Sequence, residues 1–387
     1  MPNQTQNEEL PLFRDSLLRA MEKEVAPYFE EWEAAGLIPR ETWETLGTAG
    51  LLCSDMPEKY GGSGVDFNIT LMIIEEACRL GFTGLSVGLG IHSNIVAPYL
   101  LHLGTEQQKQ QWLPKMASGK VIGALAMTEP STGSDVQAIR TNAIRDGDEW
   151  IINGSKIFIT NGVHADLIVL ACKTDPTAGA KGISLMLVDT SLPGFNRGKK
   201  LQKMGQHSSD TAELFFEDLR VPFNCILGEE GHGFFHMMKE LPRERLGCAA
   251  QAVASAQGAL DITVDYIMER KAFGQRIGDF QNSRFKIADI KTEIALNRAF
   301  LDQCSRKYRE GNLTADTAAM LKLASTEMQC KTVDECLQLF GGYGYMSEYP
   351  ISRFYVDARV QRIYAGSSEI MREIIARTVL GKAQNLS

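Results

Sequence analysis

The stretch Trp150-Ile-Ile-Asn-Gly-Ser-Lys-Ile-Phe-Ile-Thr160 is rich in β-branched residues and follows a period of two. This pattern predicts a β-strand. Because Asn153-Gly154 is a favoured two-residue turn between extended runs, the sequence also predicts a hairpin here. Similar strand patterns follow at 165–172, 183–189 and 211–216. We therefore expect a small antiparallel β-barrel or β-sandwich in this part of the chain.

On both sides of the strand region, apolar residues recur at the three- and four-residue spacing of amphipathic helices. The predicted helices cover 13–35, 39–49, 69–79, 85–102 and 106–117 before it, and 234–270, 281–310, 314–340 and 367–379 after it. The sequence thus predicts an α+β protein with an N-terminal helical domain (1–120), a middle β domain (121–230) and a C-terminal four-helix bundle (231–387).

Composition narrows the function classes. The 387 residues carry a net charge of −8 with both signs interspersed, so neither nucleic acid nor an anionic membrane surface is an expected partner. The chain shows no basic segment followed by an apolar one at its start and no uncharged run as hydrophobic as a membrane span. The eight cysteines are scattered without metal-ligand spacing, so we expect no metal and a reducing, cytoplasmic location.

Glu244 is the most informative single residue, because it precedes a run that carries no charge through Leu260. A carboxylate at the entrance of such an enclosed stretch needs a partner or a task. One interpretation is a first-turn glutamate that complements the helix dipole and pairs with a neighbouring arginine. The other is a functional carboxylate on a face of small residues that something bulky, such as another helix or a flat cofactor, approaches closely.

Several separated motifs identify a family only when taken together. Singly, each has an ordinary structural explanation, such as a polar turn, a core phenylalanine or a helix terminator. In this order and at these separations, the chain resembles the acyl-CoA dehydrogenase family over essentially its whole length, and especially its long-chain and isovaleryl branch. The motifs are Met127-Thr-Glu-Pro-Ser-Thr-Gly-Ser-Asp135, Phe158-Ile-Thr160, Arg270-Lys-Ala-Phe-Gly274, Gln338-Leu-Phe-Gly-Gly342 and Ile363-Tyr-Ala-Gly-Ser-Ser-Glu369.

The resemblance implies that FAD binds between the strand domain and the C-terminal helices and that a neighbouring subunit completes the site. Thr128 would reach the flavin ring, and Phe158 with Thr160 would cover it. Residues from Arg270 onward would hold the FAD of another subunit or its nucleotide side. The implied cofactor-binding residues are Leu125, Met127, Thr128, Gly133, Ser134, Phe158, Ile159, Thr160, Arg270, Phe273, Gln281, Gln338, Gly341, Gly342, Ser367 and Glu369.

One departure from the family pattern bears on the mechanism. Many members carry their catalytic glutamate in a C-terminal Tyr-Glu-Gly loop, where this chain has Tyr364-Ala365-Gly366. In the long-chain and isovaleryl branch the glutamate stands instead in a helical Glu-Arg-Leu context, matched by Glu244-Arg245-Leu246. The resemblance therefore implies that Glu244 is the catalytic base. The implied substrate-binding residues are Ser134, Phe235, Arg245, Ala365 and Gly366.

The activity implied is α,β-desaturation of a saturated acyl-CoA, medium to long or methyl-branched, to the trans-2-enoyl-CoA. Electrons would pass to an electron-transferring flavoprotein, and the protein would be a homotetramer built as a dimer of dimers. Two alternatives stay open: a flavin oxidase of the same fold that uses oxygen, and a non-catalytic flavoprotein relative. The small residues Gly88, Gly90, Ser93 and Ala97 favour either a wide acyl tunnel or close helix packing.

Overall fold

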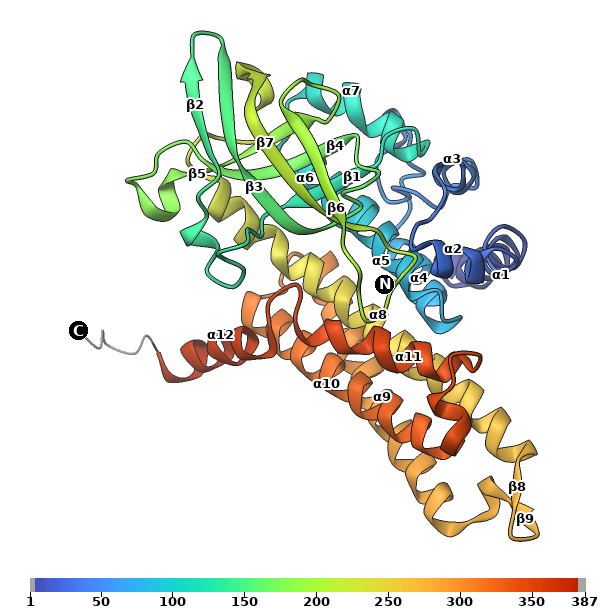
Figure 1. Cartoon of the computed structure of the whole chain (residues 1–387). Coiled ribbons are helices and arrows are strands. Elements are labelled where there is room, and N and C mark those ends of the chain that lie inside the picture. Colours follow the sequence, from blue (N-terminus) through green and yellow to red (C-terminus); the bar gives the residue numbers. More distant parts are fainter. Residues whose placement is uncertain (1–3, 382–387) are drawn as a thin grey trace. The chain divides into compact units, whose positions relative to one another are not determined.

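The computed structural model describes residues 4–381, with side chains from residue 11 onward (Figure 1). The chain forms two compact units. The first contains the chain up to Thr70, Val87–Lys203 and His207–Glu240, and the second contains Leu71–Ser86, Met204–Gln206 and the chain from Leu241. The boundaries of the three expected domains stay a prediction. Grouping the chain by its internal contacts gives two units with other bounds and does not test them.

The N-terminal part is helical as expected. Its elements are α1 (Gln4–Glu24), α2 (Phe29–Ala35), α3 (Arg40–Thr48), α4 (Phe67–Arg79), α5 (Thr83–Leu89), a π-helical segment (Gly90–Val96), α6 (Ala97–Leu103) and α7 (Glu106–Ala117). The single helix expected over 13–35 is wrong, because the chain turns between α1 and α2. Pro27 lies in this turn, lacks an N–H and disfavours helical geometry at the residue before it.

The middle of the chain forms one curled sheet from β1 (Gly123–Ala126), β2 (Asn142–Asp146), β3 (Glu149–Thr160), β4 (Leu167–Lys173), β5 (Ile183–Asp189), β6 (Phe195–Lys200) and β7 (Thr211–Pro222). Their order is β1-β4-β2-β3-β7-β6, with β5 also on β4. The expectation of a purely antiparallel sheet is wrong, because β1 and β2 each pair with β4 in parallel. Strand β4 is accordingly buried on both faces, as parallel strands are.

The hairpin predicted at Asn153-Gly154 is also wrong, since both residues lie inside the continuous strand β3. The β2–β3 turn instead contains Gly147, at φ +62°. Gly154 marks an irregularity in the pairing of β3 with β7, and a Cβ there would lie 2.5 Å from Thr141 Oγ1. The glycine therefore permits a close approach within the sheet and does not form a turn.

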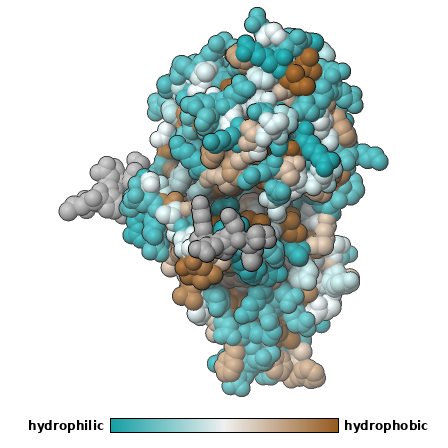
Figure 2. Space-filling view, turned by 90° about the vertical axis from the view of Figure 1, so that its left-hand side faces the viewer, coloured by the Kyte–Doolittle hydropathy of each residue, from teal (hydrophilic) through white to brown (hydrophobic). Residues whose placement is uncertain are grey.

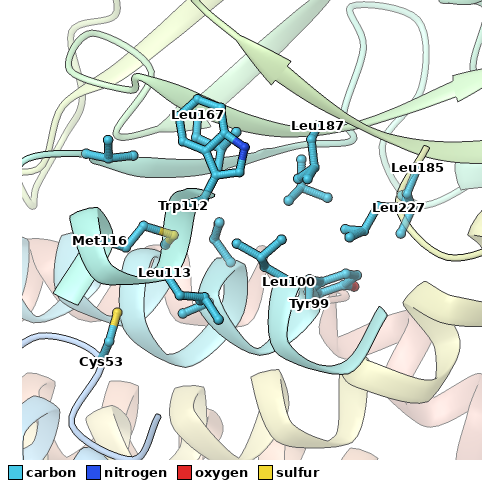
Figure 3. Packing of buried hydrophobic residues seen from close by; sticks show 14 of the residues in the cluster. Cys53, Tyr99, Leu100, Trp112, Leu113, Met116, Leu167, Leu185, Leu187 and Leu227 are labelled. Carbon is cyan, nitrogen blue, oxygen red and sulfur yellow. The ribbon is translucent and has the colours of Figure 1, made fainter. Parts of the chain in front are cut away.

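A hydrophobic cluster joins the N-terminal helices to the sheet within the first unit (Figure 3). Leu100 and Trp112 lie on α6 and α7 and belong to this cluster together with the strand residues Leu167 and Leu187. The alternate β4 residues, such as Ile168, belong to a second cluster on the other face of the sheet. The helical layer and the sheet therefore share one core.

The expectation that no segment matches a membrane span needs correction. Residues Thr83–Leu103 are apolar and long enough to pass a test based on length and composition. However, 78% of that window is buried inside the protein, which is typical of a core helix.

The C-terminal part is a helical bundle, as expected. It consists of α8 (Gly233–Glu269), a short hairpin of β8 (Lys271–Ala272) and β9 (Gln275–Arg276), α9 (Gln281–Arg309), α10 (Ala315–Phe340), α11 (Pro350–Arg359) and α12 (Ser368–Leu380). Helix α10 packs against α9, α11 and α12. Helix α11 was not predicted. Its Pro350 occupies the first helical turn, where the missing N–H costs nothing.

Candidate active site

Phe158 stands in an unusual backbone conformation in β3. Between Lys156 and Ile159 the strand shifts by one residue against β7, which is the pattern of a β-bulge. Phe158 lies at φ +60°, and its ring is 65% exposed. A bulky residue in the left-handed region is costly unless its surroundings fix it, and such outliers gather at functional sites. The bulge turns the Phe158 ring outward and leaves Ile159 in the core.

A buried ion pair anchors the predicted flavin segment to this bulge. Lys156 Nζ lies 2.9 Å from Glu129 Oε1 and donates to the carbonyl of Met127 at 2.9 Å. The Glu129 carboxylate also accepts from the backbone N–H groups of Arg140 and Thr141, at 2.6 and 2.9 Å. Both charged groups therefore have close partners, as a buried pair requires.

The pKa values of the two partners reflect this arrangement. Burial alone would raise the pKa of Glu129, but Lys156 and the hydrogen bonds to the carboxylate outweigh burial and hold that pKa below its usual value. Burial lowers the pKa of Lys156, and Glu129 opposes the shift. The ionised pair fixes the backbone from Met127 onward.

The predicted cofactor residues of the first unit lie in two segments, 125–134 and 158–160. The backbone N–H of Ile157 donates to the carbonyl of Thr128 at 3.0 Å, so the flavin segment and the bulge lie side by side. The side chain of Ile159 belongs to the sheet core, which leaves only its backbone available to a ligand. Leu125, Met127, Thr128 and Thr160 are half-buried, whereas Gly133 and Ser134 are exposed.

Glu244 does not open a helix, contrary to one sequence interpretation. It lies about three turns inside α8, far from the first turn, where a carboxylate complements the helix dipole. Glu244 and its neighbours Arg243 and Arg245 are all buried. Arg243 donates to the Tyr308 hydroxyl at 3.2 Å. The helix-dipole explanation of Glu244 is therefore excluded.

The small-residue face of α8 receives other helices of the second unit. A Cβ on Gly258 would lie 2.1 Å from the carbonyl oxygen of Arg79, at the end of α4. Gln251 donates to the Ser86 hydroxyl at 3.1 Å. Cys248 donates to Gln361 Oε1 at 2.9 Å. The sequence suggested that either another helix or a flat cofactor approaches this face. Along the later part of the face, the neighbour is a helix.

Arg245, the residue that follows Glu244, lies next to the loop Tyr364–Gly366. A Cβ built on Gly366 would lie 3.7 Å from Arg245 Nη2, so the guanidinium is close to the loop. Arg245 Nε is buried without a hydrogen-bond partner. Burial lowers the pKa of Arg245, and the charge of Glu244 opposes the shift. Arg245 thus interacts with Glu244 through its charge and adjoins the loop that contains Ala365.

A pocket of about 650 Å³ gathers four of the predicted cofactor residues in the second unit. Its walls include Arg270, Gln338, Gly341 and Gly342, and a Cβ at either glycine would meet nothing within 4 Å. Two of its aromatic lining residues, Tyr266 and Tyr343, lie outside the sequence motifs. The Arg270 guanidinium lies 5.3 Å from the Tyr343 ring centre.

The β8–β9 hairpin next to this pocket carries Phe273, at φ +52° and 96% exposed. Gln281, the first residue of α9, is also exposed. The Phe273 ring meets the Phe280 ring edge-on, with 6.4 Å between ring centres, but it stays almost fully exposed. Phe273 therefore suits contact with another molecule.

Ser367 and Glu369 lie at the start of α12. The Ser367 hydroxyl caps the helix by accepting from the Ile370 N–H at 3.4 Å. Backbone hydrogen bonding and the Ser367 side chain lower the pKa of Glu369.

In the first unit, the predicted substrate residue Phe235 on α8 is about half exposed. Figure 2 shows apolar patches scattered over a mostly hydrophilic face.

Two of the four positions considered for a wide acyl tunnel, Gly88 and Ser93, are packed against protein. A Cβ on Gly88 would lie 3.2 Å from Asn161 Oδ1 and 3.6 Å from Trp43. The Ser93 hydroxyl accepts from the Cys53 N–H at 3.0 Å. Both contacts support close packing at these positions.

Comparison with known proteins settles the family. Profiles of the acyl-CoA dehydrogenase N-terminal, middle and C-terminal domains match residues 7–120, 124–219 and 231–380. The chain belongs to the acyl-CoA dehydrogenase family. The long-chain specific acyl-CoA dehydrogenase of Rattus norvegicus mitochondria is 47% identical over 96% of this chain and 86% of the relative. The isovaleryl-CoA dehydrogenase of Pongo abelii mitochondria is 39% identical over 96% and 88%.

Solved structures agree. An acyl-CoA dehydrogenase from Geobacillus kaustophilus is 48% identical over 96% of this chain and 98% of its own, with a TM-score of 0.94. A structure described as the electron transferring flavoprotein of Acidaminococcus fermentans is 38% identical over 99% and 100%, with a TM-score of 0.93. A glutaryl-CoA dehydrogenase from Mycobacterium smegmatis in complex with FADH2 is 27% identical over 99% and 96%, with a TM-score of 0.91.

This acyl-CoA dehydrogenase family member is an oxidoreductase of a flavin-binding family, and its residues fit FAD. The open space above Gly341 and Gly342, the arginine in the same pocket and the exposed aromatic rings match a flat, phosphate-bearing group. The motif-based prediction gave no role to the buried side chains of Lys156, Glu129 and Lys322. Glu129 lies inside the 127–135 motif, whereas Lys322 could have been noticed as a charged residue in an apolar sequence context.

Proposed function

We propose that the chain desaturates a saturated acyl-CoA between its α and β carbons, with Glu244 as the base. The observation that carries this proposal is the buried Glu244 on α8, whose neighbour Arg245 lies beside a loop that has Ala365 where many family members have glutamate. Removal of the weakly acidic α-proton requires a positioned base, and apolar enclosure makes a carboxylate a stronger base than it is in water.

The thioester oxygen needs hydrogen-bond donors as charge develops on it. Alanine at position 365 keeps its backbone N–H and gives up the carboxylate, so the loop supplies a donor without a competing base. Arg245 adds positive charge beside Gly366, which favours an anion at this loop. When bound, FAD supplies the acceptor for the β-hydride.

Each unit contains predicted cofactor residues that would bind a part of such a flavin. In the first unit, the Phe158 ring and Thr160 stand at the bulge beside Thr128, where they would cover a flat ring. In the second, Arg270 and the two glycines would receive a phosphate-bearing portion, and Ser367 with the start of α12 would bind the nucleotide side. Phe273 at the hairpin tip would extend to the cofactor of another subunit, in a dimer of dimers.

Glu244→Gln tests the proposal. We expect FAD to remain bound and turnover to fall by at least about a hundredfold, because a general base contributes about 10²–10⁴. Glu240→Gln is the matched control. Glu240 is a buried carboxylate on the same helix, paired with His102 at 2.9 Å, and its loss should affect stability more than chemistry. If Glu244→Gln kept more than a hundredth of wild-type activity, the assignment of the base would be wrong.

The electron acceptor and the substrate need separate measurements. We propose an electron-transferring flavoprotein as acceptor, supported by the similarity to the structure that carries this description. Peroxide release during turnover would instead favour the oxidase alternative. The two relatives described above favour long or methyl-branched substrates. Anaerobic bleaching of the flavin by straight and branched acyl-CoAs would rank them.

The cellular setting that we propose is a reducing one, such as the cytoplasm. All eight cysteines are free and most are buried. Burial raises the pKa of several of these thiols, for example Cys78 and Cys172 to about 12, so they behave as apolar core residues.

A further inference from the structure

Lys322 on α10 is a fully buried lysine with an unusual partner. Its Nζ donates to the backbone carbonyl of Gly366 at 2.8 Å. No carboxylate lies at ion-pair distance from it among the described residues. A buried ammonium that contacts a neutral carbonyl loses its hydration without gaining the attraction of a salt bridge. The presence of a lysine at this buried position therefore requires an explanation.

The nearest carboxylate on the same helix serves the other side of the same loop. Glu327 accepts from the Ser368 hydroxyl at 2.8 Å and pairs with Arg362 at 2.7 Å. Arg362 and Ser368 flank the loop on either side. Helix α10 therefore holds the loop by its flanks through Glu327 and by its middle through Lys322.

The loop needs such support, because its backbone is strained. Ala365 lies at φ +53° and Gly366 at φ +95°. The left-handed region is unfavourable for alanine, so an unsupported loop would relax. A hydrogen bond that fixes the Gly366 carbonyl restricts the backbone dihedral angles of Gly366. It therefore restricts the backbone of Ala365 as well.

We propose that Lys322 is a positioning residue that fixes the Ala365-Gly366 backbone so that the Ala365 N–H stays directed at the substrate thioester oxygen. This inference rests on the proposed function. Lys322 does not touch substrate in this proposal and acts only through the Gly366 carbonyl. Its removal should therefore harm recognition of the thioester carbonyl more than recognition of the rest of acyl-CoA.

The test compares two ligands in a background that does not turn over. Glu244→Gln and Glu244→Gln/Lys322→Met, both loaded with FAD, are titrated with octanoyl-CoA and with S-octyl-CoA, the thioether that lacks the carbonyl oxygen. We expect the double variant to bind octanoyl-CoA about tenfold more weakly, which is about 1.4 kcal/mol, and S-octyl-CoA within about twofold. Hydrogen exchange of the 361–368 backbone should also become faster.

Lys286→Met is the matched control, because Lys286 on α9 pairs with Glu335 of α10 and does not contact the loop. It should leave the ratio of the two affinities unchanged. Lys322→Arg, which keeps a charged donor, should restore part of the octanoyl-CoA affinity and covers the case in which Lys322→Met does not fold. Equal weakening for both ligands, or an unchanged ratio, would overturn the inference. Failure of wild-type flavin to bleach with any acyl-CoA would instead overturn the proposed function.

Discussion

Each compact unit has a buried lysine that holds a backbone segment with predicted site residues, and the two lysines do so differently. In the first unit, Lys156 pairs with the buried carboxylate of Glu129 and also bonds the Met127 carbonyl. In the second, Lys322 bonds the Gly366 carbonyl and has no ion-pair partner in the part of the chain that the structure describes. A buried charge that is paired can be purely structural. A buried charge that instead bonds the loop containing Ala365 suggests a role in function.

Lys156→Met should have the largest effect on stability. It leaves the buried carboxylate of Glu129 without its cation, which costs about 3–5 kcal/mol. Urea unfolding would measure the change. Lys156→Met with Glu129→Gln should cost less than the sum of the single changes, because neither partner is then left charged. Additivity would show that the pair is not coupled, and the contrast with Lys322 would fail.

Lys322→Met should destabilise the protein less, by about 1–2 kcal/mol, because it removes one hydrogen bond to a carbonyl together with the cost of a buried charge. The same urea experiment gives the value. A loss as large as that of Lys156→Met would mean that Lys322 has an ionised partner in solution.

A fall in pH should change the free energy of unfolding through the Lys156–Glu129 pair but not through Lys322. The folded-state pKa of Glu129 lies below its usual value, so the stability it supplies is present above about pH 4.3 and is lost as pH falls through the folded pKa. Unfolding free energies between pH 6 and 3 should therefore fall more steeply in the wild type than in Glu129→Gln. Lys322→Met should keep the wild-type slope. Parallel curves for wild type and Glu129→Gln would contradict this.

Ala365→Gly should have the smallest effect. Glycine relieves the left-handed strain but adds entropy to the unfolded chain, so the two effects nearly cancel, within about 1 kcal/mol. Thermal unfolding would check it. Ala365→Val should be clearly destabilised, since a β-branched residue disfavours this conformation. Equal melting temperatures for the two variants would show that the backbone at this position is not held as described.

The sequence by itself determined the family, the helix–strand–helix order and most helix positions, because periodicity and the spacing of motifs are local properties of the chain. It also singled out Glu244 and Ala365, since each stands in a short, diagnostic context. The hairpin predicted at Asn153-Gly154 was wrong, because Gly154 permits the close approach of Thr141 and does not form a turn.

Only the tertiary structure decided that Glu244 is buried together with both flanking arginines, that Arg245 adjoins Gly366 and that Phe158 projects from a bulge. It alone revealed that Lys156 bonds the Met127 carbonyl and that Lys322 bonds the Gly366 carbonyl. Burial, backbone strain and the partner of a charge depend on residues far apart in the chain, so no local pattern specifies them.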